Sequence, residues 1–297
     1  MVSAAAFVVI VCTLSDTCGA SVRGASGRGR WDVATTVLLY SEFEPYREFV
    51  ECLGAKLRDV AEVSLLPIEH FVLSEALERR GCFVFCTNVS YCSPLVEALV
   101  ALGNRVLNPG IATRARDRLT TNAWLSARNV SVPAYWTSAN PAKFLESVPP
   151  TAYPIVLKPL NYPKQTHLVI ENREMLRHHL SSSRMPGSHS EAVYFAQQYN
   201  QLHEYTKVYA CASQVAAYRK FIPFRTPERL TPTEEIRSLA ARVADVLDLD
   251  FFSLDLVLNP FGVSIVDVNT YPIFKFHPEA YEWMIGLVRQ RLQESLP

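Results

Sequence analysis

The stretch SIVDVNTYP, residues 264–272, ends a run of apolar residues with two polar ones, Asp267 and Asn269. In a β-strand, side chains two positions apart lie on the same face. The apolar run predicts a partly buried strand, so a carboxylate and an amide share its better-covered face. Polar groups in such a place need partners, because burying them alone is costly. This pair is therefore a candidate for a binding site.

The residues before this stretch predict the other half of a β-hairpin. FFSLDLVL (251–258) is a second apolar run, and the NPFG between the two runs is typical of a turn. With the turn centred on Phe261, Asp255 lies directly opposite Asp267, because the two are equally far from the centre. Directly opposed residues of an antiparallel pair share a face. The predicted hairpin therefore brings Asp255, Asp267 and Asn269 together.

Two carboxylates that face each other on a covered surface repel and lose hydration. A divalent cation removes both problems, and a few oxygen ligands supplemented by water and phosphates suit Mg²⁺. The alternative is that the acids lie at a solvent-exposed rim, where they need no ion. Because the second acid falls at the facing position, we expect Asp255, Asp267 and Asn269 to bind Mg²⁺.

Three predicted strands upstream each carry a cation that can point inward. These are Lys158 in YPIVLKP, Lys207 in EYTKVYA and Arg219 in AAYRKF. Any one of them alone is compatible with a long side chain that reaches solvent from a strand end. Together with a metal-binding hairpin they predict a cradle for a nucleoside triphosphate, because phosphoryl chemistry needs Mg²⁺ and cations around the phosphates.

Four further residues are candidates with more than one interpretation. His167 either contacts a phosphate or substrate, or is a half-buried histidine with ordinary partners. Arg118 follows Asp117 at the helix after NPGI, where a surface ion pair is the simpler expectation. Gln197 and Gln198 end a predicted strand and can present backbone groups to an adenine edge, in a segment that also suits a hinge.

The order of predicted elements indicates an α/β protein. Strands and helices alternate from residue 35 to about 108, which predicts a parallel sheet in an N-terminal lobe. A helix is expected at 111–129, strands at 152–160 and 165–172, and an antiparallel meander of three strands within 192–221. A helix at 231–250 can be capped by Thr231 or Thr233. The hairpin and a closing helix at 278–293 follow.

In this order the chain resembles the ATP-grasp superfamily over about residues 105–290, and most closely the inositol trisphosphate 5/6-kinase and inositol tetrakisphosphate 1-kinase family. Four segments carry the resemblance: NPGIATRARDRLTTNAWLS, YPIVLKPL with QTHLVIEN, AQQYNQLHEYTKVYACASQVAAYRK, and FFSLDLVLNPFGVSIVDVNTYP. The resemblance implies an N-terminal lobe (35–108) and an ATP-grasp domain (109–297) that clasps ATP, after a leader at 1–34.

Carried over by position, the resemblance implies that Arg118 and Lys158 contact the nucleotide. It also places Gln197 at the adenine hinge, with Gln198 beside it. His167, Lys207 and Arg219 then surround the phosphates or the phosphorylated substrate, with Lys207 touching both. The implied activity is transfer of the γ-phosphoryl of ATP to a hydroxyl, most closely that of an inositol polyphosphate.

The acceptor end departs from that family. Its N-terminal lysines are missing from YSEFEPYREF (40–49) and FCTNVSYCSP (85–94), and YPIFKF (271–276) lacks two glycines. The alternative function is an ATP-grasp ligase that joins a carboxylate to an amine or thiol through an acyl phosphate. A third hypothesis, a non-catalytic nucleotide-binding relative, does not explain why the three metal-ligand positions are filled.

Composition limits the partners. The 297 residues include 29 Lys and Arg against 29 Asp and Glu, so the formal charge is zero and a general nucleic-acid surface is not expected. No apolar run is long enough for stable membrane insertion. Residues 1–34 form either a disordered leader or a secretory signal, or lie upstream of the true start. The odd number of cysteines, without a zinc-binding spacing, predicts buried free thiols and a reducing compartment, so we expect a cytoplasmic protein. We also expect a monomer that acts on a small molecule.

Overall fold

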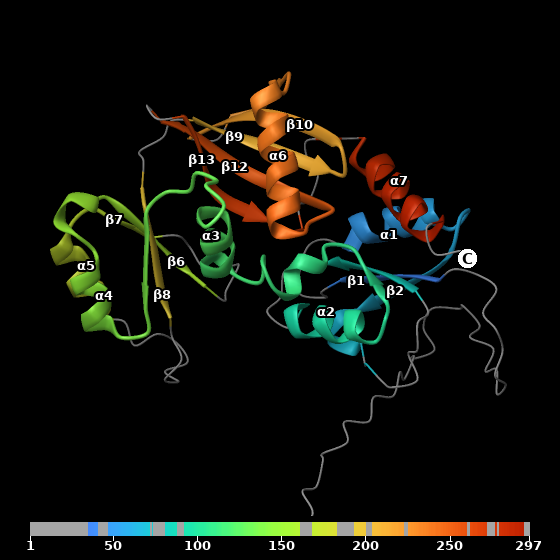
Figure 1. The fold of residues 1–297 in the computed structure, drawn as a ribbon, viewed down its shortest axis with the longest axis horizontal. Coiled ribbons are helices and arrows are strands. Elements are labelled where there is room, and N and C mark those ends of the chain that lie inside the picture. The colour runs from blue at the N-terminus through green and yellow to red at the C-terminus, as the bar shows by residue number, and fades with distance from the viewer. Residues whose placement is uncertain are drawn as a thin grey trace, which may run out of the picture. The chain divides into compact units, whose positions relative to one another are not determined.

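The computed structural model of the protein describes residues 35–40, 47–71, 73, 81–87, 92–160, 168–182, 193–199, 204–222, 225–259, 262–271, 277 and 279–293. The chain divides into two compact units. The first comprises Met1–Thr87, Pro94–Pro109 and Pro278–Pro297, and the second comprises Asn88–Ser93 and Gly110–His277. Each unit is described by itself below (Figure 1).

The first unit is built on a parallel sheet with the strand order β2-β1-β3-β4. Its helices follow the strands in the predicted alternation, so the α/β character expected of the N-terminal lobe is confirmed. The buried core residues of β1 and β3 are apolar on both faces, which is usual in a parallel sheet. The elements are β1 (Thr35–Tyr40), α1 (Arg47–Leu57), β2 (Glu62–Pro67), η1 (Ile68–His70), β3 (Gly81–Cys86), α2 (Cys92–Ala101) and β4 (Arg105–Val106).

The closing helix α7 (Ala280–Gln293) belongs to this first unit, whereas the sequence-based boundary placed it in the domain from residue 109 onward. The helix contacts α1 and β3. Lys56 of α1 pairs with Glu282, and Arg289 lies 2.8 Å from Asp59. The order of elements along the chain could not predict this, because the C-terminal segment packs with the N-terminal residues of the first unit.

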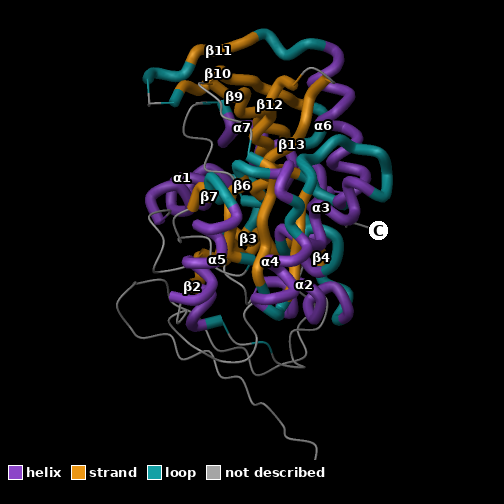
Figure 2. The backbone as a smooth tube through the Cα atoms, turned by 90° about the vertical axis from the view of Figure 1, so that its left-hand side faces the viewer, coloured by secondary structure: helices purple, strands orange, loops and turns teal. Residues whose placement is uncertain are grey.

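The second unit contains a five-stranded antiparallel sheet with the order β11-β10-β9-β12-β13 (Figure 2). Helix α6 (Glu234–Leu247) crosses one face of it (Figure 1). The predicted cap at Thr233 is confirmed, since its hydroxyl accepts from the amide of Ile236 at 3.3 Å. The strands are β9 (Glu204–Cys211), β10 (Gln214–Phe221), β11 (Glu228–Leu230), β12 (Phe251–Asn259) and β13 (Gly262–Asn269).

The same unit contains a smaller antiparallel sheet with the order β5-β8-β6-β7. Its strands are β5 (Tyr135–Ser138), β6 (Ile155–Pro159), β7 (Leu168–Ile170) and β8 (Tyr194–Gln198), and its helices are α4 (Pro141–Ser147) and α5 (Arg173–Ser182), with η3 (Pro150–Ala152) between. The predicted three-strand meander is therefore wrong in part. β9 and β10 form a hairpin, but β8 pairs with β5 and β6.

The helix expected at 111–129 is shorter than predicted. A 3-10 turn η2 (Pro109–Ala112) comes first, and α3 spans Arg118–Ser126. Asp117 is the N-cap, because its Oδ1 accepts from the amide of Thr120 at 2.8 Å. The acid beside Arg118 thus begins a helix, and this leaves Arg118 at the first helical position. Within the described residues, no helix has the length and apolar character needed to cross a bilayer.

Candidate functional site

The predicted pairing of Asp255 with Asp267 is confirmed, but a β-bulge produces it. Near the turn, Leu256 faces Ile265, a register in which Asp255 would face Val266. The register shifts between Asp255 and Leu256, so Val266 is the extra residue and Asp267 becomes the partner of Asp255. A bulge leaves one residue outside the regular ladder and re-aims its neighbours. Here it aligns the two carboxylates.

Lys207 joins this pair from the neighbouring strand. It is the direct cross-strand partner of Asp255 in β9, and its Nζ lies 2.9 Å from Asp255 Oδ1. The two side chains are 13% and 22% exposed. Burial raises the pKa of Asp255, an effect that the nearby Lys207 opposes and Asp267 reinforces. The carboxylate therefore requires a cation beside it to remain charged at little cost.

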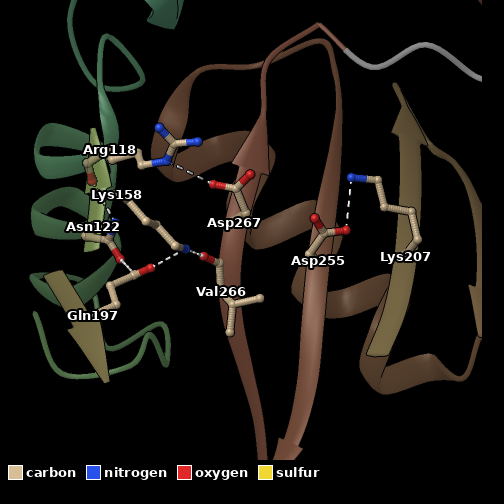
Figure 3. Close-up of polar contacts among 8 residues, drawn as sticks. All are labelled: Arg118, Asn122, Lys158, Gln197, Lys207, Asp255, Val266 and Asp267. Carbon is tan, nitrogen blue, oxygen red and sulfur yellow. Dashed lines mark hydrogen bonds and ion pairs between the residues drawn. The ribbon is translucent and has the colours of Figure 1, made fainter. Parts of the chain in front are cut away.

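Arg118 takes the equivalent place beside the other carboxylate. Its Nε lies 3.5 Å from Asp267 Oδ1, and both side chains are mostly covered. The arginine comes from the first turn of α3, while Asp267 comes from β13, so the contact joins α3 to the hairpin (Figure 3). The third predicted ligand, Asn269, accepts a hydrogen bond through Oδ1 from the amide of Tyr271 at 3.1 Å.

Lys158, which is predicted to contact the nucleotide, is buried. Its Nζ donates to Gln197 Oε1 at 2.5 Å and to the carbonyl of the bulged Val266 at 2.8 Å (Figure 3). Burial lowers the pKa of Lys158, with a smaller upward effect from Asp267 and a downward one from Arg118. The ammonium thus lies between the small sheet, which supplies β6 and β8, and the hairpin of β12 and β13.

Gln197 and Asn122 extend this contact to α3. Gln197 is buried, and its Nε2 donates to Asn122 Oδ1 at 3.0 Å. Asn122 Nδ2 donates in turn to the carbonyl of Arg118 at 2.6 Å. Sequence reasoning missed Asn122. The signal was its position one helical turn after Arg118, on the same side of the helix.

Arg219 is not brought together with the other cations. It faces Thr206 across the hairpin, whereas Lys207 faces Tyr218, so Arg219 lies on the opposite face of the sheet. There it is 43% exposed and contacts Glu228 at 3.4 Å and Glu204 at 3.9 Å. This position does not support the predicted role of Arg219 around the phosphates.

The cation of β10 on the site face is Lys220, which the sequence analysis did not select. Its Nζ lies 5.4 Å from the ring centroid of Tyr205, its cross-strand partner. The signal was available, because Cys211 and Gln214 pair across a two-residue turn. Counting back from that turn puts Tyr218 opposite Lys207, and Lys220 on the same face two residues later.

His167 and Gln198 are the two remaining candidates. His167 lies outside the described residues, so its contact with a phosphate or substrate stays a prediction. Gln198 is exposed, and its backbone N–H donates to the carbonyl of Ala134 at 2.8 Å. Its role beside adenine stays a prediction as well. The side chain of Gln197 takes part in the Lys158 network, and the predicted place of Gln197 at the adenine hinge stays a prediction.

The candidate metal ligands are two carboxylates and an amide oxygen. In the described part of the chain, no three His, Cys, Asp or Glu side chains are grouped so that they could hold one metal ion. A hard cation such as Mg²⁺ accepts carboxylate and amide oxygens with water and phosphate completing its shell. The donor set therefore fits Mg²⁺ better than a metal that needs nitrogen or sulfur ligands.

Comparison with solved structures defines the class of fold. The chain is similar to a RimK domain ATP-grasp protein from Sphaerobacter thermophilus, with a TM-score of 0.68 and 17% identity over 86% of this chain and 98% of that one. It is also similar to D-alanine–D-alanine ligase from Bacillus anthracis in complex with ATP, with a TM-score of 0.66 and 10% identity over 89% and 98% of the two chains.

A third similar structure is the ATP-grasp ligase PsnB with a minimal precursor, Mg and ADP, with a TM-score of 0.60 and 15% identity over 87% of this chain and 98% of that one. No protein-family model and no curated sequence matches the chain. The chain therefore has the ATP-grasp fold, as predicted.

Proposed function

We propose that the protein is an ATP- and Mg²⁺-dependent ligase that joins a carboxylate to an amine or thiol. The observation that carries the proposal is the cross-strand pair Asp255 and Asp267, with Lys207 and Arg118 beside it, in an ATP-grasp fold. Solved structures similar to this chain are described as ligases, which favours ligation over transfer to a hydroxyl.

The residues divide the work by charge. Asp255, Asp267 and Asn269 would hold Mg²⁺, which neutralises charge on the phosphates when bound. Lys158 is buried with its ammonium fixed by two acceptors, and this suits a group that receives a nucleotide phosphate as a point charge. Lys207 and Arg118 pair with the carboxylates in the structure and lie where they can turn to phosphate oxygens.

The reaction follows in two balanced steps. A carboxylate oxygen of the acceptor attacks the γ-phosphorus, the bond to the bridging oxygen breaks, and ADP leaves while an acyl phosphate forms. The amine or thiol then attacks the acyl carbon, phosphate leaves with the bonding electrons, and the nucleophile loses its proton. Lys207 and Lys220 lie on the same sheet face as Asp255, from which they would offset the negative charge that develops in both steps.

An inositol polyphosphate kinase is the second candidate, because four sequence segments resemble that family. Product analysis separates the two. Purified protein is incubated with ATP, Mg²⁺ and either inositol tris- or tetrakisphosphate or a panel of amino acids and other carboxylates with amines. We expect release of ADP and phosphate only with a carboxylate and a nucleophile. A more highly phosphorylated inositol without free phosphate would overturn the ligase in favour of the kinase.

A further inference from the structure

Gln197 and Asn122 form a one-directional relay that no catalytic step uses. An ammonium can only donate, so Lys158 requires the oxygen of Gln197 to face it. The Nε2 of Gln197 must then point to Asn122, which presents Oδ1 and directs its own Nδ2 to the carbonyl of Arg118. Each side-chain amide therefore has one acceptable orientation. The chain of hydrogen bonds links β6 to β8 and β8 to α3 (Figure 3).

The other end of the relay lies on the metal-binding hairpin. Lys158 also donates to the carbonyl of Val266, the residue that the bulge leaves outside the regular ladder. The next residue, Asp267, contacts Arg118. The relay thus begins at the carbonyl of Arg118 in the first turn of α3 and ends at Val266. Val266 is next to Asp267, the carboxylate with which Arg118 pairs.

We propose that Gln197 and Asn122 are positioning residues, which hold the Lys158 ammonium and the first turn of α3 at fixed places relative to the metal-binding hairpin so that both cations meet the nucleotide phosphates. This inference rests on the proposed function, because it assigns these residues to the nucleotide end of that site. It does not depend on which acceptor the protein uses.

The physical reason is preorganisation in a covered place. Lys158 is 6% exposed, so a lost acceptor cannot be replaced fully by water. Without the Gln197 oxygen, the carbonyl of Val266 is the one that remains of these two acceptors. The ammonium can then move toward the hairpin. Residues that orient a ligand-binding group commonly change affinity by roughly 10- to 100-fold when removed.

The test uses the full chain and measures nucleotide binding by calorimetry, with MgADP and a non-hydrolysable MgATP analogue. Gln197→Met keeps the length of the side chain but removes both polar atoms. Gln197→Glu keeps the acceptor for Lys158. Gln214→Met is the control, because it makes the same change at an exposed position at the start of β10, outside the candidate site. Thermal melting of each variant reports folding separately.

We expect Gln197→Met to weaken nucleotide binding roughly 10- to 100-fold, Gln197→Glu to weaken it less because it keeps the acceptor for Lys158, and Gln214→Met to match the wild type. Asn122→Ala, which leaves Lys158 its acceptor but loosens Gln197, should weaken binding by a smaller factor. A folded Gln197→Met protein with wild-type affinity overturns the inference. If Gln197→Met does not fold, wild-type affinity in Asn122→Ala overturns it.

These outcomes separate the inference from the proposed function. A wild-type protein that binds MgADP tightly but shows no ligation with any carboxylate refutes the ligase while the variants still test the relay. A protein with ligase activity and unchanged affinity in Gln197→Met refutes the relay alone. A wild-type protein that binds no nucleotide refutes both.

Discussion

Lys207 Nζ lies 2.9 Å from Asp255 Oδ1, and the two residues are also direct partners across β9 and β12. The lysine is therefore fixed both by its strand register and by its charge partner. We predict that Lys207→Met lowers the free energy of unfolding by about 2–3 kcal/mol, because removing one partner leaves a mostly covered charge uncompensated. Urea unfolding followed by circular dichroism measures the change.

The control for this prediction replaces both partners. Lys207→Met combined with Asp255→Leu removes the stranded charge and should recover most of the stability. Lys143→Met provides a second comparison, where a smaller loss is expected because Lys143 and its partner Glu146 are 73% and 60% exposed and solvent screens their attraction. Equal stability of Lys207→Met and the wild type would show that the ion pair contributes nothing.

Asp267→Ala should abolish turnover and leave the protein folded. The change removes a predicted Mg²⁺ ligand and the partner of Arg118, at a side chain that still has 28% exposure, so the surrounding core is not opened. We expect ADP formation to fall by at least about a hundredfold at any Mg²⁺ concentration. Glu228→Gln, which changes an acid on the opposite sheet face, should have wild-type rates. Full activity of Asp267→Ala would refute the metal assignment.

Deletion of Val266 tests what the bulge does. Counted from the turn, the residue after Ile265 takes the place opposite Asp255, and in the deletion that residue is Asp267. The carboxylate pair should persist while the carbonyl acceptor of Lys158 disappears. We expect Mg²⁺-dependent binding to remain with weaker nucleotide affinity, measured by calorimetry. Loss of all metal dependence would mean that the bulge itself shapes the metal site.

The hairpin shows how much of the site could be predicted. The prediction of Asp255 opposite Asp267 is confirmed, although it assumed a turn centred on Phe261. Near the turn, where Leu256 faces Ile265, the ladder is centred half a residue before that position. The extra residue Val266 shifts the register beyond it, so Asp255 faces Asp267 as predicted. Two-residue alternation contains no information on a bulge, so the prediction succeeded without its actual cause.

The sheet assignment shows the opposite case. The order of β8, β9 and β10 along the chain suggested one meander, yet β8 lies between β5 and β6 in the smaller sheet. Strand propensity is local, whereas the choice of partner depends on packing with distant segments. β5 was not predicted, and without it the smaller sheet had no place for β8. The free thiols expected from the cysteine count are confirmed at Cys52, Cys82, Cys86, Cys92 and Cys211.

Thiol labelling provides a prediction independent of function. Burial raises the pKa of Cys211 to about 12, with a further upward effect from Asp250. The thiolate is the reactive form, so at pH 8 Cys211 should resist iodoacetamide in the folded protein. Cys52 is exposed and should be labelled first. Mass spectrometry of the native and urea-unfolded protein measures both, and rapid labelling of native Cys211 would contradict the buried strand position.

Gly110 should not tolerate a side chain. Its amide donates to the carbonyl of Asp248 at 3.0 Å, and a Cβ there would lie 1.7 Å from the carbonyl oxygen of Leu247. The obstacle is backbone at the C-terminal end of α6, which cannot move aside as a side chain can. We predict that Gly110→Ala lowers the free energy of unfolding by about 3 kcal/mol.

The matched control for Gly110→Ala is Gly286→Ala in the middle of α7, where an added Cβ meets nothing within 4 Å. Since alanine favours a helix over glycine, that variant should gain about 0.5–1 kcal/mol. Urea unfolding of the two variants therefore gives shifts of opposite sign. If Gly110→Ala is as stable as the wild type, the segment before α3 does not pack against the end of α6. In that case the end of α6 would not help to hold α3, and Arg118 with it, at its distance from Asp267. Nucleotide affinity measured on the same variant would show whether the position of Arg118 has changed.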